Sequence, residues 1–179
     1  MASIEKDPKK TLRLAKKLGN ENWKFRSWLK FNAPDNIDEI VSGLSRKYFS
    51  LIDCRECGNC CRAFSAIHVC KSEIATMAEA KGMPYSEFET KHVVGADERD
   101  ALKVKLPCPM LKGNLCSIYS TRPKTCQEFP NLEKPDFVRR LWQVVENTAI
   151  CPIVFNVYEE LKTVLSWRKR RKVRTGTLQ

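Results

Sequence analysis

The sequence predicts a mainly helical α+β fold, a small compact domain in which cysteine-bearing loops and one short hairpin surround a metal centre. Three observations predict it. Apolar residues recur at helical spacing in several segments, one short segment alternates between apolar and polar residues, and the nine cysteines are clustered. Clustered thiols in a chain rich in lysine and glutamate indicate thiolate ligation in a reducing compartment rather than a disulfide framework.

The N-terminal segment is predicted to be helical and basic. Leu12, Ala15 and Leu18 share one face of a short amphipathic helix that ends at Gly19. Aromatic residues then interleave with cations, which favours a helix that lays its aromatic rings on the body of the protein; stacking on nucleic-acid bases is the alternative. The apolar residues of this stretch are Trp23, Phe25, Trp28, Leu29 and Phe31, and its cations are Lys24, Arg26 and Lys30.

The segment before the cysteine cluster has the clearest helical periodicity. It predicts a helix over 35–52, with Asp35 or Asn36 as its N-cap. The next predicted elements are a short extended piece at 67–69, a helix over 72–81 capped by Ser72 and ended by Gly82, a short helix over 86–94, and an acidic loop over 95–100.

The second half of the chain is predicted to contain a strand, a hairpin and three helices. Strict alternation favours a strand over 102–106, and a turn at 112–114 is expected to bring Cys116 back toward Cys108. A short helix that Pro123 opens carries Cys126. Longer helices are predicted over 137–145 and 152–165; the dipole of the second helix favours the thiolate form of Cys151 at its N-terminus.

The net charge of +11 is concentrated at the two ends of the chain. Residues 1–30 contain nine Lys or Arg against three Asp or Glu, and residues 161–179 contain seven against none. We therefore predict a basic aromatic helical extension over 1–34, a cysteine-cluster metal-binding domain over 35–166 and a basic C-terminal tail over 167–179.

Four cysteines lie close together at Cys54, Cys57, Cys60 and Cys61. A two-residue gap lets two thiolates reach one soft metal ion. A helix would gather these thiols on one face, whereas Gly58 favours a tight turn with amides pointing at sulfur, and both geometries stay open. Because neighbouring side chains diverge, the adjacent pair indicates two metal ions or one multinuclear cluster.

The other cysteines complete a longer pattern. The chain contains Cys54-x-x-Cys57-Gly58-x-Cys60-Cys61, Cys108-Pro109-x-Leu111, Cys116-x-Ile118-Tyr119-x-x-Arg122-Pro123-x-x-Cys126-x-x-Phe129 and Cys151-Pro152. These motifs resemble the CxxCxxCC cysteine-cluster family (YkgJ type), described as zinc- or iron-chelating domains, which includes the flagellin lysine N-methylases. The resemblance covers roughly residues 45–165.

The resemblance implies a metal site made of eight thiolates: Cys54, Cys57, Cys60, Cys61, Cys108, Cys116, Cys126 and Cys151. Tyr119 and Arg122 lie inside the pattern, and we expect Arg122 to offset the charge of the thiolates through hydrogen bonds to sulfur; holding a substrate carboxylate is the alternative. Cys70 is expected to be a small buried side chain, and His68 and His92 to be structural or solvated.

Zinc and iron both agree with this ligand set. Eight thiolates satisfy two tetrahedral zinc sites, whereas close cysteines followed by a distant Cys-Pro resemble the run that holds an iron–sulfur cluster in ferredoxins. The predicted function is metal binding, by a centre that is structural or serves metal handling.

Two alternatives to this function remain. One is a lysine N-methylase that the metal or cluster assists, although the sequence shows no glycine-rich loop for S-adenosylmethionine. The other is a nucleic-acid-associated module: the basic run of 167–174 is expected to bind RNA or DNA weakly, with Trp167 adding a stacking contact. With no apolar signal segment and no membrane-spanning run, the chain is expected to be cytoplasmic.

Overall fold

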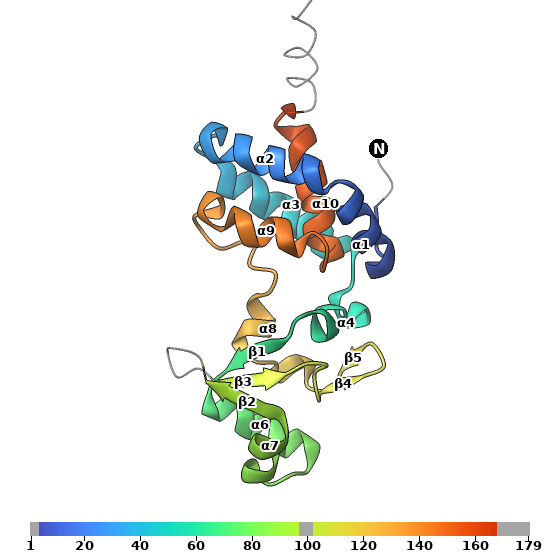
Figure 1. Ribbon diagram of the computed structural model, residues 1–179, viewed down its shortest axis with the longest axis vertical. Coiled ribbons are helices and arrows are strands. Elements are labelled where there is room, and N and C mark those ends of the chain that lie inside the picture. The colour runs from blue at the N-terminus through green and yellow to red at the C-terminus, as the bar shows by residue number, and fades with distance from the viewer. Residues whose placement is uncertain (1–3, 97–101, 168–179) are drawn as a thin grey trace, which may run out of the picture. The chain divides into compact units, whose positions relative to one another are not determined.

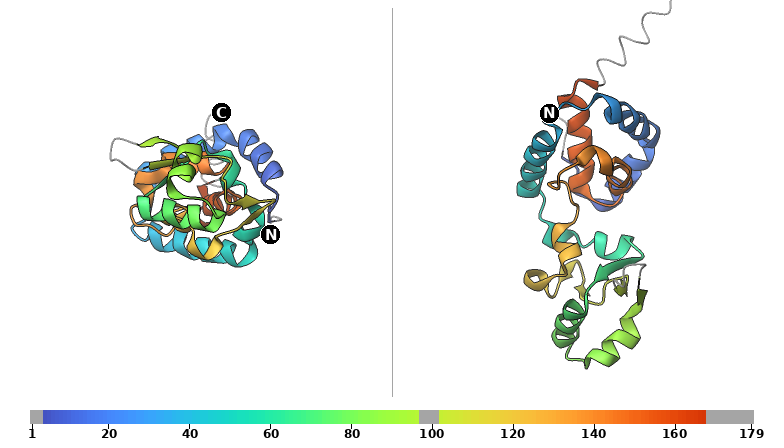
Figure 2. Two further views of the ribbon diagram at one scale, coloured as in Figure 1. Left: turned by 90° about the horizontal axis from the view of Figure 1, so that it is seen from below. Right: turned by 90° about the vertical axis from the view of Figure 1, so that its left-hand side faces the viewer.

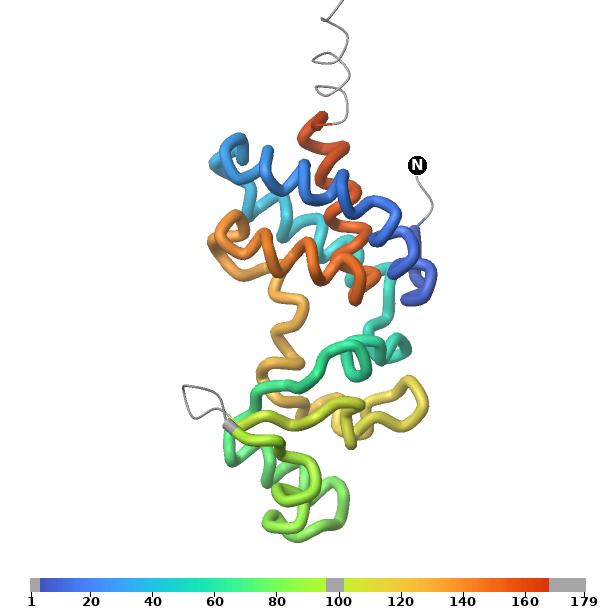
Figure 3. The backbone as a smooth tube through the Cα atoms, viewed as in Figure 1, coloured from blue at the N-terminus to red at the C-terminus, as the bar shows by residue number. Residues whose placement is uncertain are grey.

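The computed structural model describes residues 4–96 and 102–167 (Figure 1). It consists of two compact units: a helical unit, Met1–Ile52 with Pro130–Gln179, and a cysteine unit, Asp53–Phe129. The chain leaves the helical unit after Ile52 and returns to it at Pro130 (Figure 3). The predicted parts 1–34, 35–166 and 167–179 stay predictions, because a division by packing does not test which segments fold or act alone.

The elements confirm the predicted class, since most are helices and the strands are short and antiparallel. In the part of the chain that the structure describes, no helix is long and apolar enough to cross a membrane. The helical unit contains α1 (Pro8–Lys17), α2 (Gly19–Asn32), α3 (Ile37–Leu51), the 3-10 helix η2 (Phe137–Arg140), α9 (Leu141–Asn147) and α10 (Pro152–Val164).

Helix α10 passes through the middle of the helical unit, with α3 on one side and α1 and α2 on the other (Figure 2). Its side chains are buried around most of its circumference, as expected for a central helix. The ring of Tyr158 meets that of Phe25 on α2 edge-on, with centroids 5.2 Å apart. The prediction that the N-terminal aromatic segment packs on the body is therefore correct for Phe25 and Leu29, both fully buried.

Trp167 differs from the prediction. Instead of standing free at the start of a tail for a stacking contact, its side chain is 5% exposed, and its ring centroid lies 5.2 Å from that of Phe25. The Trp167 ring is buried because it packs against the Phe25 ring of the helical unit. The cationic run after Trp167 lies outside the described residues.

The cysteine unit contains mostly short elements joined by short connections. They are α4 (Cys54–Cys57), α5 (Cys60–Ala63), β1 (Ala66–Val69), α6 (Lys71–Lys81), α7 (Tyr85–His92), β2 (Val93–Ala96), β3 (Leu102–Lys105), β4 (Leu111–Lys112), β5 (Leu115–Cys116), the 3-10 helix η1 (Tyr119–Thr121) and α8 (Lys124–Glu128).

The larger sheet has the strand order β1-β3-β2 and is antiparallel throughout. The predicted strand over 102–106 is confirmed as β3, at the centre of this sheet, with Val104 opposite Ile67 and Val93. Strand β2 was not predicted. The helix expected over 86–94 ends at His92, and the β-branched pair Val93 and Val94 continues as an edge strand.

Helix α6 begins differently from the prediction. Its N-cap is Cys70 rather than Ser72, and the Glu73 carboxylate accepts a hydrogen bond of 2.8 Å from the Cys70 amide. Gly82 ends the helix in the left-handed conformation, as predicted. Cys70 is exposed, so the expectation that it is buried is wrong: a residue at the cap of a surface helix faces solvent.

The smaller sheet is the predicted hairpin. Leu111 pairs with Cys116 and Lys112 with Leu115, around a turn in which Gly113 has a positive φ of 58°. This pairing places Cys116 beside the segment that follows Cys108, as expected.

Candidate metal centre

The first cysteine cluster combines a helical turn with a tight turn, so both geometries left open by the sequence occur. Helix α4 carries Cys54 and Cys57, and its N-cap Asp53 accepts a hydrogen bond of 2.9 Å from the Arg55 amide. Gly58 then adopts φ 56°, the left-handed conformation that ends α4. Cys60 and Cys61 open the next short helix, α5, so the reversal at Gly58 redirects the chain between the two pairs of thiols.

The turn at Gly58 is pressed against the β4–β5 hairpin. A Cβ at this position would lie 2.7 Å from the carbonyl oxygen of Asn114. The guanidinium of Arg62 holds the two segments together: Nη1 donates to the Gly58 carbonyl at 2.9 Å, and Nη2 donates to Asn114 Oδ1 at 2.9 Å and to the Gly113 carbonyl. Glycine and arginine together therefore connect the first cysteine cluster to the hairpin that carries Cys116.

Replacing Gly58 by alanine is expected to destabilise the cysteine unit by more than the strain of a left-handed alanine, which is about 1–2 kcal/mol. The added methyl group would overlap the Asn114 carbonyl, so the hairpin has to move away. Gly113→Ala is the matched control, because Gly113 has φ +58° but a Cβ added there would meet no atom within 4 Å. Urea unfolding measures the loss of stability in both variants. Equal losses would show that the close approach of Gly58 to Asn114 does not contribute to the effect.

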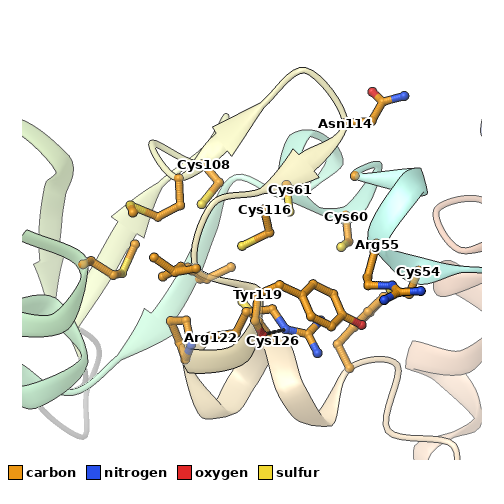
Figure 4. Close-up of a pocket in the computed structure, with 17 residues that line it drawn as sticks. Cys54, Arg55, Cys60, Cys61, Cys108, Asn114, Cys116, Tyr119, Arg122 and Cys126 are labelled. Carbon is orange, nitrogen blue, oxygen red and sulfur yellow. Dashed lines mark hydrogen bonds between the residues drawn. The ribbon is translucent and has the colours of Figure 1, made fainter. Parts of the chain in front are cut away.

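Six of the predicted ligand cysteines line one pocket of the cysteine unit (Figure 4). They come from four segments: α4, α5, the β3–β4 connection with the hairpin, and α8. The Cys108 amide donates to the Cys61 carbonyl at 2.9 Å, which joins two of these segments directly. The six are Cys54, Cys60, Cys61, Cys108, Cys116 and Cys126.

The walls between these thiols are largely apolar. Cys108, Cys116 and Cys126 pack against the buried core of the unit, and Met77 and Met110 face both the core and the pocket. Among the residues that the structure describes, no three or more Cys, His, Asp or Glu side chains are drawn together tightly enough to hold a metal ion. The described thiols thus share a pocket without forming a closed set of metal ligands.

Burial raises the pKa of three of these thiols, Cys54, Cys108 and Cys126, and so keeps them protonated at neutral pH. Loss of solvation raises the pKa of Cys108 to about 11 and that of Cys126 to about 12. The pKa of Cys61 shifts in the opposite direction: a hydrogen bond from the Cys60 thiol, assisted by the charges of Arg62 and Arg122, lowers it to about 7 despite burial. A bound cation reverses the effect of burial on such thiols, because it stabilises the thiolate.

Arg122 and Tyr119 form one wall of the pocket (Figure 4). The guanidinium carbon of Arg122 lies 3.6 Å from the centroid of the Tyr119 ring, and its Nε donates to the Tyr119 carbonyl at 3.0 Å. Burial raises the pKa of Cys54 and Cys126, and the positive charge of Arg122 opposes that rise at both thiols. Arg122 is therefore placed to favour thiolates.

The remaining cysteines and both histidines lie elsewhere. Cys57 lies in α4, outside the lining, and burial raises the pKa of its thiol. Cys151 belongs to the helical unit, where it is buried as the N-cap of α10. Cys70 is exposed at the start of α6, His68 lies in β1, and the ring of His92 packs on Phe88 with centroids 4.7 Å apart.

Sequence reasoning missed Arg62, Arg55 and Asn114. Arg55 and Asn114 line the pocket, and Arg62 joins two of its segments. The signal in the sequence for Arg62 is a single cation directly after four clustered thiols. For Asn114 the sequence has no such signal, because its role depends on the approach of the hairpin to Gly58.

Comparison with known proteins gives one match. A family model with the description "CxxCxxCC: Putative zinc- or iron-chelating domain" matches residues 53–152, more than half of the chain. The matched range contains the whole cysteine unit together with Cys151. No curated protein and no solved structure matches the chain significantly.

Proposed function

Because the chain belongs to the CxxCxxCC family of zinc- or iron-chelating domains, we propose that it binds zinc or iron through cysteine thiolates and that this centre is structural. The observation that supports the proposal is the shared pocket of six thiols from four segments. Soft thiolates in such numbers suit zinc and iron–sulfur clusters and do not suit magnesium or calcium, which prefer oxygen ligands.

The proposed ligand set contains all eight cysteines of the family pattern. The six thiols of the pocket form its main part, and Cys57 contributes from α4, the helix that also carries Cys54. Cys151 is included because it lies within the matched range, with its thiol at the N-terminus of α10. Eight thiolates complete two tetrahedral zinc sites, and four of them suffice for one iron–sulfur cluster.

The short helices of the cysteine unit support a structural role. Helices α4 and α5 have four residues each and α8 has five. Helices of this length do not persist alone in water, since the cost of nucleation is not recovered within one turn. A metal that joins their cysteines would fix these turns relative to one another, and structural zinc contributes about 10–16 kcal/mol of apparent binding free energy in small domains.

The cations around the pocket agree with an anionic centre. Four thiolates around Zn²⁺ leave a net charge of −2. Arg55 and Arg122 line the pocket, and Arg62 holds two of its segments together. We propose that Arg122 compensates this excess charge. The lysine methylase activity stays a hypothesis that comes from the family resemblance alone.

Elemental analysis of the full-length chain, purified once in air and once without oxygen, tests the proposal. We expect either about two zinc ions per chain and no visible absorption, or iron with sulfide and a broad visible band from the anaerobic preparation. Removing the metal with a chelator should then lower the unfolding temperature. A chain that holds neither metal in either preparation would contradict metal binding. Unchanged stability after metal removal would contradict the structural role and favour metal handling.

A further inference from the structure

The helical unit contains a pair of tryptophans of which one, Trp142, is exposed and the other, Trp23, is half-buried. Trp142 on α9 is 60% exposed, although the same short helix buries Leu141, Val144 and Val145. Helix α9 lies beside α2 (Figure 1), and the ring centroid of Trp142 lies 4.6 Å from that of Trp23 on α2. A large indole left in water on a surface marks a binding site more often than a single exposed aliphatic residue does.

The guanidinium of Arg26 lies close to both tryptophan rings. The guanidinium carbon of Arg26 lies 5.5 Å from the Trp23 ring centroid and 5.4 Å from that of Trp142. Its Nε is buried and, within the residues that the structure describes, has no hydrogen-bond partner. The guanidinium is therefore held by the two rings. We call Trp23, Arg26 and Trp142 the indole patch.

Two further cations lie within four residues of the indole patch along the chain; one of them, Lys30, holds its ammonium 5.4 Å from the centroid of the Phe31 ring. Lys30 follows Arg26 by one turn on the same face of α2 and is exposed. Arg139 precedes Trp142 by three residues, and its side chain is 83% exposed, with Asp136 at 3.9 Å as a weak ion-pair partner. Glu146, one turn after Trp142, is the acidic residue on this side of α9. The three cations outnumber Glu146 and Asp136, so these residues together leave a net positive charge.

We propose that the indole patch binds single-stranded nucleic acid, with one unpaired base stacked on Trp142 and the neighbouring phosphates paired with Arg26, Lys30 and Arg139. An exposed π-face next to a row of cations matches a ligand that alternates bases and phosphates. A duplex does not offer the stack, because its bases already cover one another. The site lies in the helical unit and does not depend on the proposed metal centre.

Fluorescence anisotropy with a labelled oligo(U) of about twelve nucleotides, a length within the range of single-strand site sizes, tests the proposal on the full-length chain at low salt. Trp142→Ala is expected to weaken binding about 5- to 150-fold, the range for the loss of one stacked base. Trp142→Phe keeps an aromatic face and should retain most of the affinity. Phe49→Ala, which removes an aromatic ring that is 39% exposed on α3, is the control and should change nothing.

Salt dependence separates stacking from charge. Trp142→Ala should leave the slope of log K against log salt unchanged, whereas Lys30→Ala and Arg139→Ala should each flatten it by about 0.7, the value for one phosphate contact on a single strand. Equal binding of oligo(U) by the wild type and Trp142→Ala, or equal competition by inorganic polyphosphate, would overturn the proposal and assign the binding to charge elsewhere on the chain. Absence of oligo(U) binding by the wild type would also overturn it. Metal content, measured on the same samples, is expected to be the same in all variants.

Discussion

Replacing Cys126 by serine is expected to release bound metal and to unfold the cysteine unit at a temperature well below that of the wild type. A hydroxyl is a hard and weakly acidic ligand, so it does not replace a thiolate on zinc or iron. The remaining buried thiolates would also lose the cation that stabilises them. Because structural zinc contributes about 10–16 kcal/mol in small domains, the loss of one of its ligands outweighs any single packing contact.

Elemental analysis and thermal unfolding measure these losses. Cys70→Ser is the matched control: the substitution is chemically identical, but Cys70 is exposed at the cap of α6 and lies outside the pocket lining. This variant should keep the metal and the wild-type unfolding temperature. Loss of metal from Cys70→Ser together with full retention by Cys126→Ser would overturn the ligand assignment.

Cys151→Ser, measured alongside, tests the ligand that comes from the family match alone. Cys151 is buried in the helical unit, whereas the six thiols of the pocket belong to the cysteine unit. A ligand at this position predicts loss of metal comparable to that of Cys126→Ser. Full metal content in Cys151→Ser would reduce the set to the seven remaining cysteines of the family pattern, all of them in the cysteine unit.

Lys162→Met is expected to destabilise the helical unit by about 3–5 kcal/mol without changing the metal content. The Lys162 side chain is fully buried in α10. Its ammonium donates to Asn22 Oδ1 at 2.5 Å, to Glu159 Oε1 at 2.5 Å and to Glu21 Oε1 at 3.2 Å. Methionine fills a similar volume but leaves two carboxylates, whose side chains are 25% and 19% exposed, without this counter-charge.

Lys47→Met is the control for a lysine that pairs at the surface. Its ammonium lies 2.7 Å from Glu160, but the lysine side chain is 49% exposed, so water replaces most of the interaction. The expected loss is about 0–1 kcal/mol. Chemical unfolding followed by tryptophan fluorescence measures both variants. Equal losses of stability in the two variants would show that burial does not strengthen the interactions of the Lys162 ammonium.

Local patterns in the sequence were sufficient for most of the elements. The periodicity over 35–52 and 152–165 predicted α3 and α10, because a helix that buries one face or all faces repeats its apolar residues at the helical period. Alternation over 102–106 predicted β3, and the turn at Gly113 predicted the hairpin. Each of these signals lies within one stretch of chain.

The local pattern was insufficient or misleading where contacts with residues distant in sequence determine the secondary structure or the burial of a residue. Val93 and Val94 form an edge strand because β3 is beside them, whereas the sequence predicted the end of a helix. Trp167 is buried because its ring packs against that of Phe25 on α2, although the cations that follow it in the sequence suggested a solvated tail.

The ligand chemistry could be read from the residues alone, because clustered thiols suit zinc or iron and stand in a pattern that the family model recognises. That six thiols share one pocket, and that Gly58, Arg62 and Asn114 hold two of its segments together, became visible only in the folded chain. Ligand type is a property of each side chain, whereas a pocket is the result of contacts between segments far apart in the chain.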